Sequence, residues 1–114
     1  MGAPFDKDFD ANPLDAFAFE ALAVSTTSVS FTAATFGPTT GPPAIMAKFS
    51  VETAAVRSRS DGTAPTATTG EVFEPGDEVI VWGIRDITSI RFIRRDGIDS
   101  TLAVHYYRPV GIGG

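Results

Sequence analysis

Cysteine is absent from this 114-residue chain, and histidine occurs once, at His105. Without a thiol the chain cannot form a disulfide framework, a thiolate zinc site, an iron–sulfur centre or a cysteine nucleophile. A single imidazole excludes a multi-histidine metal site within one subunit. The serines offer no replacement nucleophile, because none of Ser58, Ser60, Ser89 and Ser100 stands in a Gly-x-Ser-x-Gly turn. We therefore expect no enzymatic activity, no metal and no cofactor.

Long apolar runs and positive charge are also scarce. No stretch approaches the roughly 20 continuous apolar residues that a membrane-spanning helix needs, and the N-terminus lacks the basic start and apolar run of a secretory signal. Lys and Arg number nine against 14 Asp and Glu, which gives a formal net charge of -5. Such a chain lacks the broad positive field that non-specific nucleic-acid binding requires. We expect partners that are neither membranes nor nucleic acids.

The negative charge is concentrated at the start of the chain. Residues 1–20 carry a net charge of -4, so the rest of the chain sums to about -1. We interpret residues 1–15 as an extended acidic arm with apolar anchors; its carboxylates are Asp6, Asp8 and Asp10, and its anchors are Phe5, Phe9 and Leu14. Two interpretations stay open: a mobile terminus, or an arm that becomes ordered against a neighbouring subunit.

The sequence after the arm is typical of β-strands. Apolar residues alternate with other residues at a period of two, which places the two sets on opposite faces of a sheet. Strands are predicted over 17–24, 28–32, 45–52, 55–59, 78–82, 90–95 and 102–107. No window shows sustained helical periodicity. The sequence predicts an all-β fold: a small antiparallel β-sandwich of about seven or eight strands, jelly-roll-like or barrel-like, over 16–110, with a flexible Gly-rich end at 111–114.

Glycine, proline and aspartate mark the connections between these strands. Asp96-Gly97 separates two alternating segments so closely that it predicts a tight hairpin. Residues 33–44 are predicted to be a loop, because their three prolines would remove ladder donors from a strand. Residues 60–72 are predicted to be a second loop.

Arginine is the notable charged residue of the later strands. Arg85, Arg91, Arg94 and Arg95 fall within eleven residues, and two further arginines share one face of a strand at 57 and 59. Such a patch can bind phosphates or single-stranded nucleic acid, or it can serve a protein interface, where arginine pairs with carboxylates. We favour the interface, in which Arg91, Arg94 and Arg95 receive the acidic arm of a neighbouring copy.

One composite pattern indicates a family. The segment ETAAVRSRSDGTAPTA at 52–67 is succeeded by Gly70, by Pro75-Gly76-Asp77, by Ile90–Arg94 and by Leu102–Tyr107. Over about 45–108 this pattern resembles small virion structural proteins of tailed bacteriophages. The resemblance implies an accessory capsid, neck or tail component rather than an enzyme. Asp61 and Gly62 would then form a rigid turn, either at a subunit contact or as an ordinary turn.

The resulting hypothesis is a capsid decoration or cement protein on the surface of the virion, made in the cytoplasm of the bacterial host. It would form a homo-oligomer, a trimer or a dimer, and bind the major capsid protein or another virion protein. A neck, tail or head-fibre component is the alternative within the virion. A carbohydrate-binding module is the alternative outside it, with Trp82, Tyr106 and Tyr107 as a stacking platform. An enzyme that uses His105 comes third.

Overall fold

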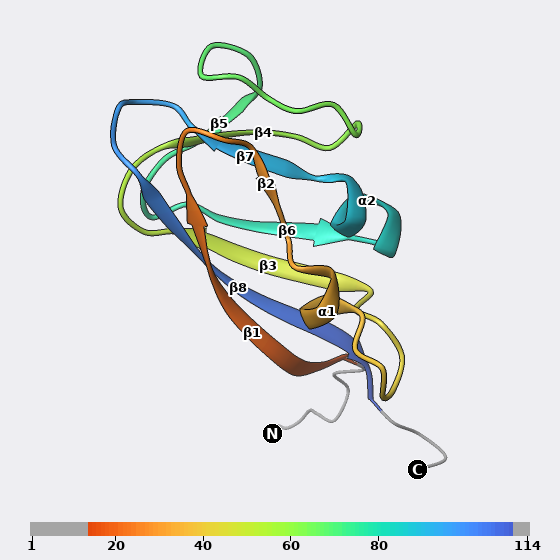
Figure 1. Cartoon of the computed structure of the whole chain (residues 1–114). Helices are drawn as coiled ribbons and strands as arrows, with labels where there is room; N and C mark the ends of the chain where they lie inside the picture. Colours follow the sequence, from red (N-terminus) through yellow and green to blue (C-terminus); the bar gives the residue numbers. More distant parts are fainter. Residues whose placement is uncertain (1–13, 111–114) are drawn as a thin grey trace.

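The computed structural model describes residues 14–110, which form eight strands and two short helices (Figure 1). The strands are β1 (Leu14–Val24), β2 (Val29–Ser30), β3 (Met46–Val51), β4 (Val56–Arg59), β5 (Glu71–Phe73), β6 (Glu78–Trp82), β7 (Arg91–Arg94) and β8 (Ser100–Pro109). The helices are α1 (Ala33–Phe36) and α2 (Ile84–Ser89).

The strands form two antiparallel sheets of four strands each, stacked on one another (Figure 1). The first sheet has the order β1-β8-β3-β6, and the second has the order β2-β7-β4-β5. Every strand pair in both sheets is antiparallel. The predicted all-β sandwich is therefore confirmed.

The core lies between the two sheets and follows the predicted alternation. On β8 the side chains of Leu102, Val104 and Tyr106 are fully buried, while the residues between them face outward. Aromatic rings join the two sheets, with the Phe49 and Phe92 centroids 5.1 Å apart in an edge-on arrangement that favours ring pairs. Burial of such large apolar side chains is the main force that holds the sheets together.

Strand β1 departs from the predicted alternation at one position. The period of two predicts Phe17 and Phe19 on the same face, but an irregularity between Ala16 and Ala18 shifts the register against β8. Phe17 packs against the core, whereas the side chain of Phe19 is 54% exposed. A β-bulge of this kind turns the next side chains to the other face. The strand also begins at Leu14, two residues before the predicted start of the domain.

One further expectation about local structure was wrong, and two others need a small change. Strands β7 and β8, on either side of Asp96-Gly97, belong to different sheets, so this turn is a crossover and not a hairpin. The predicted loops are irregular over 37–44 and 60–70, while residues 33–36 form the single turn of α1 and residues 71–72 begin β5. Helix α2 was not predicted because its six residues bury a single side chain, Ile87, which is too few to produce a helical period.

Candidate interaction surfaces

The outer face of the first sheet carries mainly apolar side chains and few charges. We call this surface the apolar face; it consists of Phe19, Ala21 and Ala23 on β1, Thr101, Ala103, His105 and Tyr107 on β8, Met46, Lys48 and Ser50 on β3, and Glu78, Ile80 and Trp82 on β6. All four strands of the sheet contribute to it. Its width is set by the register, which aligns one residue from each strand in a row across the sheet.

Large apolar side chains at both edges of this face are open to solvent. The exposed fraction is 54% for Phe19 on β1, 51% for Ile80 and 60% for Trp82 on β6. Single exposed apolar residues are ordinary on protein surfaces, but a contiguous apolar area on one sheet is typical of an interface. The apolar face is therefore the first candidate for binding a partner.

A small polar centre divides this face. The register places His105 beside Phe19 on one side and beside Lys48 on the other. The Phe19 and His105 rings are 4.9 Å apart at a tilt, so the imidazole is held against an aromatic edge. Two copies that stacked this face about a twofold axis would bring the Lys48 ammonium groups toward each other. The charge instead favours a partner that presents a carboxylate or a carbonyl oxygen.

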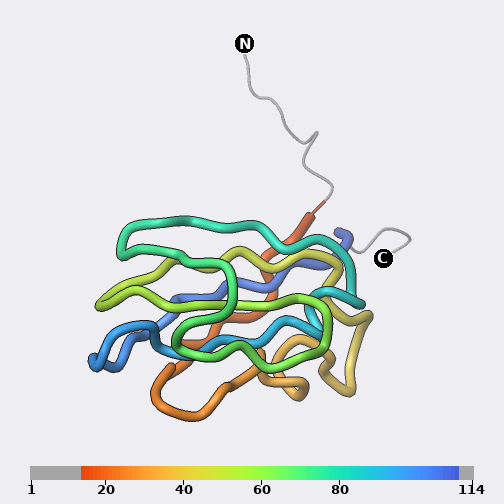
Figure 2. Tube along the Cα trace, turned by 90° about the horizontal axis from the view of Figure 1, so that it is seen from above, coloured from red at the N-terminus to blue at the C-terminus, as the bar shows by residue number. Residues whose placement is uncertain are grey.

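The outer face of the second sheet is covered by the chain's own loop. Residues 60–70 fold back across the strands, which Figure 2 shows in green from above. The guanidinium of Arg57 on β4 holds this loop by donating to the carbonyl oxygens of Ala67 and Gly70, each at 2.8 Å. Gly70 has a φ of +137°, and a Cβ there would lie 3.0 Å from the Ser58 carbonyl oxygen, so the loop ends at a position that favours glycine.

The predicted turn at Asp61 and Gly62 lies at the start of this loop. The Asp61 carboxylate accepts hydrogen bonds from Arg59 at 2.5 and 3.1 Å and from the amide of Thr63. The bond from Arg59, and to a smaller extent that from Thr63, lowers the pKa of Asp61 below its ordinary value. Gly62 takes a φ of +87°, which suits a turn glycine. These contacts account for the turn by itself, and the subunit contact stays a prediction.

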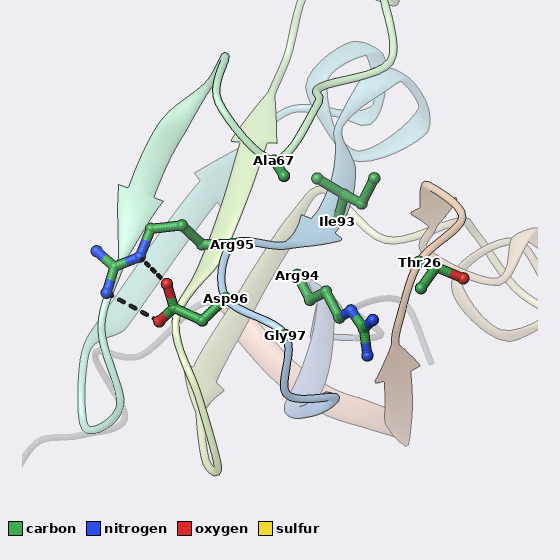
Figure 3. A pocket seen from close by; sticks show the side chains of 7 residues that line it. All are labelled: Thr26, Ala67, Ile93, Arg94, Arg95, Asp96 and Gly97. Atoms are coloured by element: carbon green, nitrogen blue, oxygen red, sulfur yellow. Dashed lines mark hydrogen bonds and ion pairs between the residues drawn. The ribbon is translucent and has the colours of Figure 1, made fainter.

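Two of the three arginines that were predicted to receive the arm already have carboxylate partners. Arg94 donates to Asp99 at 2.6 Å, and Arg95 donates to Glu74 at 2.9 Å and to Asp96 at 3.1 Å. The two side chains point to opposite sides of the strand end, at an open hollow of about 270 Å³ (Figure 3). Strand geometry points neighbouring residues in opposite directions, so these two arginines do not form one binding site for the carboxylates of the arm.

Arg91, the third arginine of that prediction, lies apart from them. It is exposed on β7, opposite Arg59 on β4 and Ser30 on β2. Among residues 14–110 it makes no ion pair. Apart from Leu14, which opens β1, the predicted residues of the arm lie outside the described residues, namely Phe5, Asp6, Asp8, Phe9 and Asp10. The arm contact therefore stays a prediction.

A groove lies where the edges of the two sheets meet, between β5 and β6. We call it the edge groove; it has a volume of about 350 Å³ and is lined by Ser58, Ser60, Glu71, Phe73, Val79, Ile80, Val81, Trp82, Asp86 and Ile90. Its lining combines an apolar floor with two carboxylates and contains no Lys or Arg. Sequence reasoning missed this groove, because one of its walls, β5, begins inside a segment predicted to be a loop.

The remaining polar candidates serve the fold. Tyr106 is buried and donates a short hydrogen bond to Glu20, whose carboxylate also accepts from the amide and hydroxyl of Thr32. Burial and then this carboxylate raise the pKa of Tyr106, so the phenol stays protonated as a donor. Tyr106 is therefore unable to stack on a sugar. Trp82 and Tyr107 do share the apolar face, with Met46 between them.

Metal sites and membrane-spanning helices are two further possibilities for the described part of the chain. Within residues 14–110, no group of three or more His, Cys, Asp and Glu side chains could hold a metal ion. No helix among these residues is long and apolar enough to cross a membrane. Comparisons with protein-family models, with curated proteins and with solved structures found no match to this chain.

Proposed function

We propose that this chain is a structural protein of a bacteriophage virion, a decoration or cement protein that binds the capsid through its apolar face. The observation that carries the proposal is the set of exposed large side chains at both edges of one sheet, Phe19, Ile80 and Trp82. Several large apolar side chains exposed on one face of a sheet support a binding role. The assignment to a virion is supported by the sequence resemblance over 45–108.

The charge of the apolar face supports a protein partner other than a second copy stacked on it. Lys48 and His105 form the polar centre of the face, and a pair of copies stacked about a twofold axis near Lys48 would bring two ammonium groups together. A capsid surface that offers a carboxylate between apolar side chains would complement it. The major capsid protein is the proposed partner, and the acidic arm extends the contact to a neighbouring subunit.

Location and copy number in purified particles test the proposal directly. A decoration protein would be present in hundreds of copies on the outside of the head, as the family resemblance implies. A dozen or fewer copies at the neck or tail would reject the capsid role and support a neck or tail component instead. Absence from the particle would reject both.

A pair of variants tests the apolar face itself. Phe19→Glu combined with Lys48→Glu places one negative charge at the β1 edge of the face and one at its polar centre, and we expect capsid occupancy to fall at least tenfold, because the charge reversal repels the expected carboxylate. The control is Ile98→Glu, since Ile98 is 58% exposed in a turn outside this face. Equal loss with both variants would show that the face has no special role.

Deletion of residues 1–13 tests the arm separately. This deletion leaves strand β1 complete, because β1 starts at Leu14. We expect the shortened protein to fold and to bind with lower occupancy, since the deletion removes the predicted anchors Phe5 and Phe9 and the three carboxylates Asp6, Asp8 and Asp10. Unchanged occupancy would remove the arm from the proposal and leave the apolar face in it.

A further inference from the structure

We propose that the edge groove between β5 and β6 binds an extended polypeptide segment with alternating apolar and basic residues. The segment would add as a further strand beside β6. This inference does not depend on the role in a virion, because it rests on the backbone geometry of β6 and on the charge of the groove, although the groove shares Ile80 and Trp82 with the apolar face.

The first argument comes from the backbone of β6, an edge strand of the first sheet. The amide and the carbonyl of Val51 on β3 bond to Asp77 and Gly76, so the odd-numbered residues of β6 face β3. Along an antiparallel pair, the N–H and C=O groups of successive residues point alternately toward the partner strand and away from it. Glu78, Ile80 and Trp82 therefore direct their N–H and C=O groups away from the sheet.

These outward groups have no partner within residues 14–110, since no further backbone hydrogen bond involves Glu78, Ile80 or Trp82. An exposed row of unpaired donors and acceptors is the template on which an extended peptide adds to a sheet. The strand contains neither proline nor lysine, two residues that commonly protect edges.

The second argument comes from the opposite wall. Strand β5 is the edge of the second sheet, and the turn 74–77 leads from it into β6. Glu71 and Phe73 line the groove, while Phe73 packs edge-on against Phe49 of the core at 5.5 Å. The floor is completed by Val79, Val81 and Ile90. It provides sites for the alternate side chains of an added strand.

Charge decides what kind of segment fits. Glu71 and Asp86 lie in the lining, Glu78 lies beside it on β6, and the lining has no cation. A segment with Lys or Arg at alternate positions complements these carboxylates. The chain's own acidic arm is a poor match, because residues 1–13 contain three Asp against a single Lys. The occupant is thus a basic, apolar strand of another protein.

Three synthetic peptides serve as probes of the full chain. One alternates Val and Lys over about ten residues, the length of a strand; the second replaces Lys by Glu; the third has the sequence of residues 1–13. Trp82 is the single tryptophan of the chain and lies at the groove, so its fluorescence reports binding without a label. Hydrogen exchange of the Ile80 and Trp82 amides reports strand addition.

We expect the Val-Lys peptide to bind at least tenfold more tightly than the other two and to slow exchange at Ile80 and Trp82. Glu71→Gln with Asp86→Asn should reduce that preference, whereas Asp15→Asn, on β1 at the far edge of the sheet, should not. Equal binding of all three peptides, tightest binding of the arm peptide, or no binding at millimolar concentration would overturn the proposal.

A backbone variant separates strand addition from simple charge attraction. Ile80→Pro removes one outward donor and no ladder bond, which edge strands tolerate, and Ile80→Ala keeps that donor. We expect at least a fivefold loss with proline relative to alanine. Equal affinity of the two variants, or binding without amide protection in the unmodified chain, would overturn β-strand addition.

Discussion

The outer faces of the two sheets differ in whether their side chains have partners within the chain. On the second sheet the half-buried arginines have nearby acceptors: Arg57 bonds to loop carbonyls and Arg59 bonds to Asp61. On the first sheet the large side chains Phe19 and Trp82 are exposed, and no loop covers them among residues 14–110. The second face is largely covered by its own chain, with Arg91 left exposed, whereas the first face stays open to solvent.

The clustered arginines are therefore poorer candidates for an interface than their spacing in the sequence indicates. Arginine clusters are typical of protein interfaces, because their guanidinium groups pair with carboxylates. In this chain the partners Asp61, Asp96 and Asp99 come from the same domain. Surface ion pairs of this kind add little to stability one by one, and their effect is to fix loops in place. Exposed apolar side chains have no such internal partner.

The largest expected difference in stability is between variants of a buried aromatic residue, Phe92, and an exposed one, Trp82. Phe92→Ala should lower the free energy of unfolding by about 3–5 kcal/mol, because it leaves a cavity in the fully buried core. Trp82→Ala should lower it by less than about 1 kcal/mol, since the indole is 60% exposed. Urea denaturation of both variants measures the difference. Similar losses would show that Trp82 has a structural role and would weaken both proposed surfaces.

A smaller difference in the free energy of unfolding is expected between variants of Arg57 and Lys48, two cations that point outward from central strands. Arg57→Met should cost about 1–3 kcal/mol, because two loop carbonyls lose a charged donor. Lys48→Met should change stability by less than about 0.5 kcal/mol, since it has no hydrogen bond or ion pair among residues 14–110. Denaturation curves give both values. Limited proteolysis of loop 60–70 should become faster in the first variant alone, and equal rates would contradict the role given to Arg57.

The strands could be predicted because their evidence is local. Side chains alternate at a period of two along any strand, so Leu102, Val104 and Tyr106 could be assigned to one buried face from the sequence. The bulge near Phe17 was missed, because one inserted residue leaves the composition of a strand unchanged. The Asp96-Gly97 crossover was missed for another reason: turn residues indicate where the chain reverses and do not indicate which sheet the next strand joins.

The candidate surfaces were harder to predict than the fold. The partners of Arg94 and Arg95 depend on how turns fold in space, which residue spacing does not provide. A useful signal was nevertheless present in β6, where Val79–Trp82 is apolar on both faces. Such a run is typical of a strand that is covered on both sides. With one side open in this chain, that run is the sequence feature that indicates a missing partner.

The smallest expected effect concerns pH and again distinguishes the two faces. Hydrogen bonds lower the pKa values of three exposed carboxyls: Asp61 through Arg59, Asp96 through Arg95, and Asp99 through Ser25 and then Arg94. A lowered pKa in the folded state means that the carboxylate contributes stability above its ordinary pKa near 3.8 and loses it as pH falls through the lowered value.

We therefore expect the triple variant with Asn at positions 61, 96 and 99 to melt slightly below the unmodified protein at pH 7, with a gap that closes as the pH falls below about 3.8. Differential scanning calorimetry from pH 7 to pH 2 measures that gap. High salt should narrow it as well, because exposed pairs are screened. A gap that is independent of both pH and salt would mean that these carboxylates act through turn geometry, and that ion pairs stabilise neither the loop on the second sheet nor the β7–β8 crossover.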